Sequence, residues 1–330
     1  MILSQSIFGK LNENIANLLV ILFFLIPLFT ILGPFFPDLF ISFTVLFSLI
    51  ISIKDKKKIY FEIFKKDVFV KFFIIFLIYL LLNSSINFLL NNKFFFDDFK
   101  NYFLRTLFLF RFIFYPISIV YLIRKYDLKF ENKFFLIIIL TILFVIIDTL
   151  IQYVFGVDLF GYVASERGAI ALNRLSGPFG DELIPGSYLM RYFFIVIFMS
   201  ILIFDEKYNK HLFTFFLILC LSTILVTGER AAFILTAFGI FLAFISIKKF
   251  RINIIISFLI LFISAFILLL ENPKLKSRVV DHTLFQLGIS NNFDDNSKMF
   301  KVDLKKFIDS PYGAHWETAF KIWQDNKLLG

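Results

Sequence analysis

The sequence has 330 residues, of which 59 % are hydrophobic, and its mean hydropathy is +0.84. Soluble globular domains are roughly 45–50 % apolar, so this composition excludes a soluble protein and requires lipid as the solvent. The net charge of +9 indicates basic loops rather than a nucleic-acid partner, because most Lys and Arg residues lie between apolar runs. The single cysteine, Cys220, excludes an intrachain disulfide and a cysteine metal site.

Long apolar runs follow one another along the chain. A helix needs about 20 apolar residues to cross a hydrocarbon core of roughly 30 Å. The sequence therefore predicts an all-α, polytopic membrane protein with about nine transmembrane helices, at residues 15–32, 35–53, 68–90, 102–123, 134–155, 185–204, 212–227, 231–247 and 252–270. We expect a transmembrane domain over residues 1–270 and an outward-facing, amphipathic helical segment over residues 271–330.

The loops between these runs alternate in positive charge. One set carries fifteen Lys and Arg residues and the opposite set carries five. Cytoplasmic loops of membrane proteins are enriched in Lys and Arg, so the amino terminus is predicted to be cytoplasmic. The hydrophilic stretches 156–184 and 271–330 then face outward.

Several polar side chains lie inside predicted spans, where charges are costly and usually functional. They are Arg105 and Arg111 in the fourth run, Asp148 and Gln152 in the fifth, and Arg191 in the sixth. With the predicted orientation, all the charged ones fall in the outer half of the bilayer. Asp148 and Gln152 are four residues apart and share a helix face. An ion pair with an intramembrane Arg is as good an interpretation of Asp148 as a functional role.

Two outer connections add further polar groups. The 156–184 stretch is rich in Gly and Pro around Arg174 and Gly177, which is typical of an ordered, tightly turning loop. Between the seventh and eighth runs, Gly228 and Glu229 precede Arg230, near the start of a helix whose free N–H groups favour an anion. Arginine suits phosphate because its planar guanidinium donates paired hydrogen bonds. We therefore expect an anionic ligand at the outer leaflet.

Three stretches resemble the O-antigen ligase and O-antigen polymerase superfamily of bacterial envelope glycosyltransferases. The first begins at Asp148 and Gln152 and continues through Gly161; the second begins at Arg174 and runs into Gly186. The third is the turn from Thr227 to Ala232, in which Glu229 stands where the family often has Ser. Together they span about a third of the chain, in family order.

The resemblance implies glycan transfer from undecaprenyl pyrophosphate to an acceptor, lipid A core for a ligase, at the periplasmic face of the cytoplasmic membrane. It implies no cofactor and no metal. By motif, Arg174 and Arg230 are expected to bind the donor pyrophosphate. Arg191 and Arg111, which are charges in the outer half of predicted spans, are expected to extend that site. Asp148, Gln152, Gly177 and Gly228 are supporting residues by the same resemblance. Membrane lipids are the other expected partners.

The family's catalytic histidine lies in a His-rich motif that this sequence lacks, so we expect the motif and further spans to follow Gly330. His315 is near in sequence but stands where relatives often carry Arg. It is predicted to begin a helix that carries a stripe of Trp316, Phe320 and Trp323, whose spacing suits an interfacial helix on the outer leaflet, with glycan stacking as the alternative. The remaining histidines, His211 and His282, have no partners in sequence.

Other functions stay open. A polymerase of the same superfamily would share all of these motifs. A polyprenyl-phosphate-sugar transferase of the other polytopic class would instead use acidic residues of an outer loop, for which Asp97 and Asp98 are the candidates. A transporter or flippase for lipid-linked saccharide could use the same arginines, although the sequence shows no duplicated pattern of the kind common in transporters.

Overall fold

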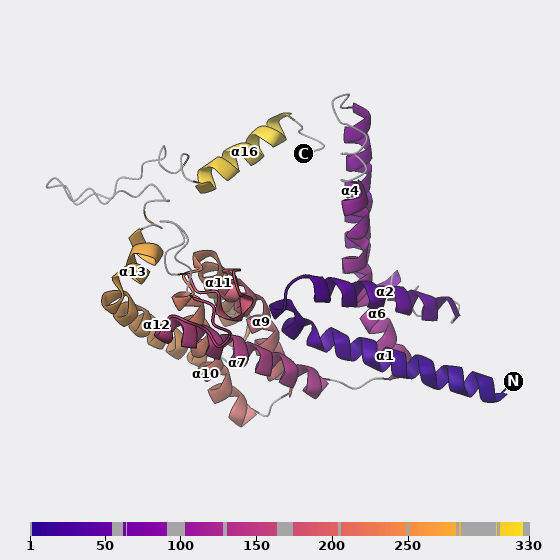
Figure 1. Ribbon diagram of the computed structural model, residues 1–330, viewed down its shortest axis with the longest axis horizontal. Helices are drawn as coiled ribbons and strands as arrows, with labels where there is room; N and C mark the ends of the chain where they lie inside the picture. The colour runs from indigo at the N-terminus through magenta and orange to yellow at the C-terminus, as the bar shows by residue number, and fades with distance from the viewer. Residues whose placement is uncertain are drawn as a thin grey trace. The chain divides into compact units, whose positions relative to one another are not determined.

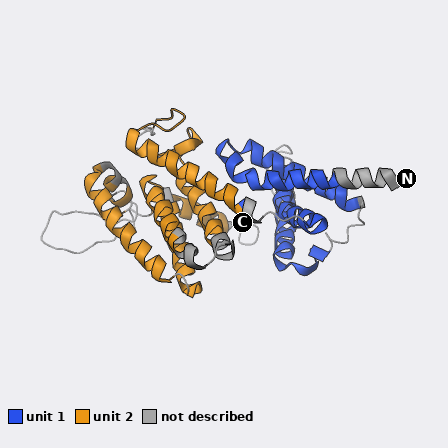
Figure 2. Ribbon diagram, turned by 90° about the horizontal axis from the view of Figure 1, so that it is seen from below, with its two compact units in different colours: residues 1–134, 329 blue, residues 135–328, 330 orange. Residues whose placement is uncertain are grey.

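The structure is a computed structural model that describes residues 2–54, 62–63, 65–90, 103–127, 131–163, 174–203, 206–248, 251–281, 284, 308 and 311–325. Every named element within these residues is a helix (Figure 1). The chain forms two compact units, residues 1–134 and residues 135–328 (Figure 2). The boundary lies near the start of α7, inside the predicted 1–270 domain. Asp97, Asp98 and His282 lie outside the described residues.

Unit 1 contains α1 (Ile2–Ile31), α2 (Phe35–Lys54), α4 (Val68–Leu90) and α6 (Phe110–Tyr126). Helix α6 contacts the other three. A cluster of Ile41 and Val45 from α2 with Tyr115 and Ile119 from α6 forms a buried core between those two helices. Between the same two helices, the Ser48 hydroxyl donates to the Ser118 hydroxyl at 2.7 Å, which pairs two buried polar groups.

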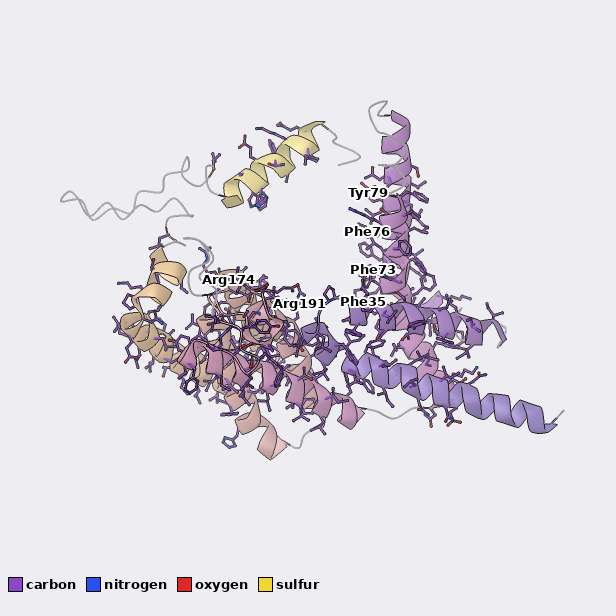
Figure 3. All side chains as sticks on the ribbon, in the orientation of Figure 1. Phe35, Phe73, Phe76, Tyr79, Arg174 and Arg191 are labelled. Atoms are coloured by element: carbon purple, nitrogen blue, oxygen red, sulfur yellow. The ribbon has the colours of Figure 1, made fainter. Side chains whose placement is uncertain are left out.

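Helix α4 is apolar on all sides. No residue of Val68–Ile86 is buried, although α4 contacts α6. Phe73, Phe76 and Tyr79 project from it (Figure 3), each more than two-fifths exposed. An apolar surface of this size is incompatible with water but matches lipid. Unit 1 is therefore embedded in a membrane.

Unit 2 contains α7 (Glu131–Phe155), whose first turn belongs to unit 1, and the packed helices α9 (Pro185–Ile203), α10 (Glu206–Val226), α11 (Arg230–Ser246) and α12 (Arg251–Glu271). Helix α10 contacts α9, α11 and α12, and its side chains Leu217, Leu221 and Ile224 are fully buried. Helices α9 and α11 approach closely at Gly239, where an added Cβ would overlap the ring of Phe194. Short helices α13 (Pro273–Lys276) and η3 (Ser277–Asp281) follow α12.

A helix covers each of the predicted runs within the described residues. Six of these helices are long and apolar enough to cross a bilayer: Asn12–Ile31, Phe35–Ile53, Val68–Ile86, Phe103–Tyr126, Phe134–Phe155 and Arg251–Glu271. Two further segments, Thr214–Val226 and Arg230–Ser246, are apolar but shorter. The protein is thus a helical membrane protein, and the count of nine spans stays a prediction.

Two helix starts differ from the sequence prediction. The fourth run is divided by a turn at Leu109, where the Leu109 N–H bonds the Thr106 carbonyl three residues back, so α6 itself begins at Phe110. Arg105 thus belongs to the helical turns before α6. The aromatic stripe lies on α16 (Pro311–Asp325), which begins before His315 rather than at it. Trp316, Phe320 and Trp323 are all at least half exposed.

Candidate functional site

The carboxyl end of α7 holds the Gly- and Pro-rich loop through Gln152. Its Oε1 accepts hydrogen bonds from the backbone N–H groups of Ser176 and Gly177, both at 2.9 Å. Its Nε2 donates to Ser176 Oγ at 3.0 Å and to the Tyr162 carbonyl at 3.2 Å. The side chain is fully buried, so this set of bonds satisfies an amide that would otherwise be costly. Gln152 therefore fixes the loop to the helix.

Asp148 lies one turn earlier on the same face of α7 and is also fully buried. Its Oδ1 accepts the Leu159 N–H at 2.9 Å, while Oδ1 of Asp158 accepts the Phe160 and Tyr162 N–H groups at 2.9 and 2.6 Å. Among the described residues Asp148 forms no ion pair with an arginine. The ion-pair interpretation is thus wrong for this part of the chain, because the Leu159 N–H is the one described partner of the carboxylate and Oδ2 has none.

Two glycines allow the backbone to turn at the site. Gly177 has φ +52°, and a Cβ there would lie 2.5 Å from Oγ1 of the buried Thr149. Gly228 has φ +71° and lies in the turn between α10 and α11. L-residues with side chains rarely adopt such angles, so the loop and the turn both depend on glycine.

Glu229, which follows Gly228, holds the start of α9. Its Oε1 accepts the Gly186 N–H at 2.7 Å, and its Oε2 accepts both the Ser187 N–H at 3.1 Å and the Ser187 hydroxyl at 2.5 Å. The first N–H groups of a helix have no partner within the helix and favour negative charge. The carboxylate of Glu229 therefore caps α9 from the turn that precedes α11, which joins two helix starts at one buried group.

Arg174 reaches the same carboxylate from the loop. Its Nη2 lies 3.8 Å from Glu229 Oε2 and donates to the Leu183 carbonyl at 2.6 Å. The side chain is 28 % exposed, so the guanidinium is held in place but still open to a ligand. Figure 3 labels this residue, together with Arg191 of α9.

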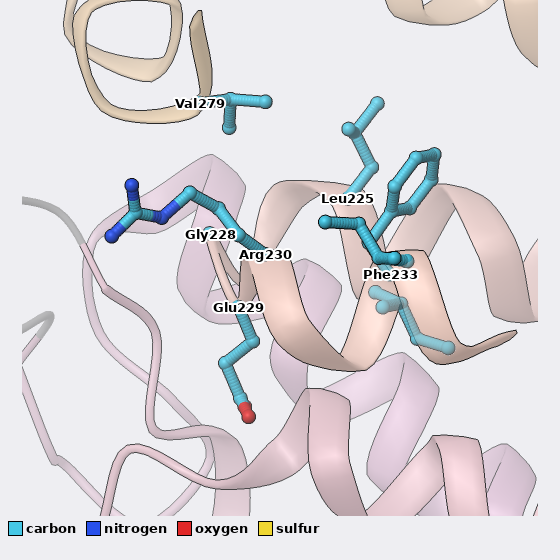
Figure 4. A pocket seen from close by; sticks show the side chains of 8 residues that line it. Leu225, Gly228, Glu229, Arg230, Phe233 and Val279 are labelled. Carbon is cyan, nitrogen blue, oxygen red and sulfur yellow. The ribbon is translucent and has the colours of Figure 1, made fainter. Parts of the chain in front are cut away.

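Arg230 is the first residue of α11 and borders a pocket of about 210 Å³. In Figure 4 its guanidinium and the carboxyl group of Glu229 point to different sides of the helix start. Apolar side chains form most of the remaining wall, contributed by α10, α11 and η3: Ile224, Leu225, Phe233, Ile234 and Val279. A cation thus stands beside an apolar cavity, an arrangement that suits the anionic end of an amphiphile.

The other two predicted arginines have different surroundings. Arg191 is exposed on α9 and makes no hydrogen bond or ion pair to any described residue. Arg111 belongs to unit 1, where its Nη2 pairs with Asp38 Oδ2 at 2.7 Å and its guanidinium lies 4.9 Å from the ring centroid of Phe112. The structure therefore places Arg174 on the carboxylate of Glu229, the residue before Arg230, whereas Arg111 has its own partner in unit 1.

Sequence reasoning did not assign the capping role to Glu229 or Ser187. One signal for Glu229 was available: it is a carboxylate between Gly228 and Arg230 in a very short turn between apolar runs. A charge in such a turn requires several hydrogen-bond donors nearby. Its donors lie more than forty residues earlier in the chain, so the pairing itself could not be read from the turn.

The fold and the site define the class of the protein: a helical membrane protein in which the starts of α9 and α11 and the loop residue Arg174 meet at the buried carboxylate of Glu229. No family model, curated protein or solved structure matches the chain. The membership of the O-antigen ligase and polymerase superfamily therefore stays a prediction from the three motif-like stretches.

Proposed function

We propose that the protein transfers a glycan from an undecaprenyl-pyrophosphate carrier to an acceptor hydroxyl at the outer face of the bacterial cytoplasmic membrane. Lipid A core is the acceptor if the enzyme is a ligase, and a growing glycan chain is the acceptor if it is a polymerase. The proposal includes the predicted topology, with about nine spans, a cytoplasmic amino terminus, and the 156–184 loop outside.

One observation carries this proposal. Arg174 and Arg230 come from separate segments, yet Arg174 contacts Glu229, which immediately precedes Arg230 in the chain. A pyrophosphate carries several negative charges, and two guanidinium groups can share them through charge-assisted hydrogen bonds. The arrangement therefore supports binding of a phosphorylated group.

The surroundings of Arg230 support a lipid-linked ligand rather than a free one. The apolar wall of its pocket would bind hydrocarbon, and the adjoining guanidinium would bind phosphate. An isoprenoid pyrophosphate has both parts. Arg191, exposed on α9, extends the site in this proposal, and Arg111 is assigned the same role only because it is a charge in the outer half of a predicted span.

The reaction requires only a substitution at the anomeric carbon. An acceptor oxygen forms the new bond, the bond from that carbon to the pyrophosphate oxygen breaks, and undecaprenyl pyrophosphate leaves. The hydroxyl proton passes to a general base, which these residues do not identify. Fixed arginines stabilise the charge that develops on the leaving group, since preorganised donors act most strongly where charge appears.

Removal of the positive charge at position 174 or 230 tests the proposed role of these arginines. We expect Arg174→Ala and Arg230→Ala each to reduce glycan transfer by about a hundredfold or more, the loss typical of removing one preorganised donor. Full-length protein in proteoliposomes, supplied with labelled lipid-linked glycan and acceptor, gives the rate. Lys321→Ala is the matched control, because it also removes one positive charge but from an exposed surface pair with Glu317. Wild-type rates in both arginine variants, at normal expression, would refute the assignment.

A further inference from the structure

A second pocket lies in unit 1, away from the residues of the proposed transfer site. It has a volume of about 290 Å³ and lies between the segment that leads into α4 and the second half of α6. Its lining residues are Ile63, Lys66, Asp67, Val70, Pro116, Ile117, Val120 and Arg124. Because α4 and α6 contact each other, the pocket is formed at the junction of two helices.

The lining changes from charged to apolar along α6. Arg124 lies in the last turn of that helix, and Lys66 and Asp67 lie just before α4 begins. Pro116, Ile117 and Val120 lie earlier on α6. Eight residues separate Arg124 from Pro116, which corresponds to about 12 Å of helix. The pocket thus has a cationic end and an apolar end.

Among the described residues, no acidic side chain neutralises the two cations of the pocket. Neither Lys66 nor Arg124 makes a hydrogen bond or ion pair to any residue that the structure describes. The one carboxylate in the lining is engaged elsewhere, since Asp67 Oδ1 accepts the Phe69 and Val70 N–H groups at 2.9 and 3.3 Å and caps α4. An anion is therefore the complementary ligand for Lys66 and Arg124.

We propose that this pocket binds an anionic phospholipid. Lys66 and Arg124 bind the headgroup phosphate, and one acyl chain lies along Val70, Val120 and Pro116. A lipid fits better than a soluble phosphate compound because α4 and the Phe103–Tyr126 segment that contains α6 are both long and apolar enough to cross a bilayer, so the apolar end of the pocket meets hydrocarbon. Basic pockets between transmembrane helices are suited to such headgroups. The inference does not depend on glycan transfer.

Native mass spectrometry of the full-length protein, titrated with phosphatidylglycerol, tests the site. Each cation near a membrane surface contributes about fivefold in affinity, so Lys66→Gln with Arg124→Gln should weaken binding about 25-fold. The matched control is Lys65→Gln with Lys125→Gln, which removes the same charge from neighbouring residues outside the pocket lining. We expect this control to stay within about twofold of wild type.

Two further ligands separate the headgroup from the chain. Phosphatidylcholine with the same acyl chains should bind more weakly than phosphatidylglycerol, and glycerol phosphate, which has no chains, should bind more weakly still. Equal weakening in both double variants, or equal binding of the two lipids, would overturn the proposal. So would binding of glycerol phosphate as tight as that of the lipid. If the Lys66 and Arg124 variant does not fold, Val120→Trp fills the apolar end with both cations intact, and undiminished lipid binding would then contradict the site.

Discussion

At the scale of single residues, the proposed site depends on one buried carboxylate. Glu229 is only 7 % exposed and accepts three hydrogen bonds from Gly186 and Ser187, in addition to its contact with Arg174. A buried charge is tolerated only where donors surround it. Because those donors include the first turn of α9, one side chain holds that helix start, the turn before α11, and the loop arginine together.

Replacing Glu229 should therefore affect stability as well as transfer. We expect Glu229→Ala to lower the free energy of unfolding by about 2 kcal/mol or more, because it removes a helix cap and leaves buried donors unpaired. Glu229→Gln keeps acceptor capacity and should lose less. Thermal unfolding in detergent measures both variants. Glu317→Ala, which removes an exposed carboxylate from a surface pair with Lys321, should change stability by less than about 0.5 kcal/mol. Equal effects of Glu229→Ala and Glu317→Ala would contradict the capping role.

Gly177 offers a second residue-scale prediction. An alanine there must adopt φ +52° and also displace Thr149, whereas an alanine at Gly156 must adopt φ +77° but meets nothing within 4 Å. The left-handed conformation costs about 1–2 kcal/mol in both variants. We thus expect Gly177→Ala to be the more destabilising of the two, and Thr149→Ala to relieve part of the difference. Identical unfolding midpoints for the two glycine variants would show that the loop does not pack on Thr149.

Sequence could predict those features of the site that depend on residues close together in the chain, but not the contacts between residues far apart in it. Asp148 and Gln152 share a face by helical geometry alone, and both side chains do contact the backbone of the same loop. The partner of Glu229 could not be predicted in this way, since local spacing does not indicate which helix start a turn will meet. The Arg111 pair with Asp38 was missed for the same reason, because seventy-three residues separate the two.

At the scale of helices, hydropathy predicted the elements better than their ends. The predicted 35–53 and 134–155 runs agree closely with α2 and α7, because lipid exposure selects for long apolar segments and charged residues mark their ends. The turn at Leu109 left no such signal. Its immediate neighbours Phe108 and Phe110 are aromatic, and an arginine stands on either side at Arg105 and Arg111, so composition does not change where the helix is interrupted.

The predicted interfacial position of helix α16 can be tested on the unmodified protein. Its Trp316 and Trp323 are the two tryptophans of the sequence, so tryptophan fluorescence, excited selectively over that of tyrosine, reports on this helix. If the exposed aromatic stripe lies at a membrane interface, lipids brominated near the headgroup should quench the emission more than lipids brominated near the chain ends. Strong quenching by aqueous acrylamide with no effect of brominated lipids would place the helix in water instead.

At the scale of the whole molecule, the chain is a helical membrane protein whose two units each have their own core. The predicted orientation has a direct test in single-cysteine variants made on a Cys220→Ala background. In intact cells, a membrane-impermeant maleimide should label Glu182→Cys, in the 156–184 loop, but label Lys65→Cys only after the membrane is opened. Both native side chains are exposed, so access from one side alone decides the result. The reverse pattern would invert the topology and place Arg174 in the cytoplasm.

The most direct test of the proposed function is the balance of products. In proteoliposomes that contain full-length protein, lipid-linked glycan and acceptor, we predict one undecaprenyl pyrophosphate released for each glycan joined to the acceptor. Movement of intact lipid-linked glycan across the bilayer, without release of undecaprenyl pyrophosphate, would contradict transfer and identify the protein as a transporter.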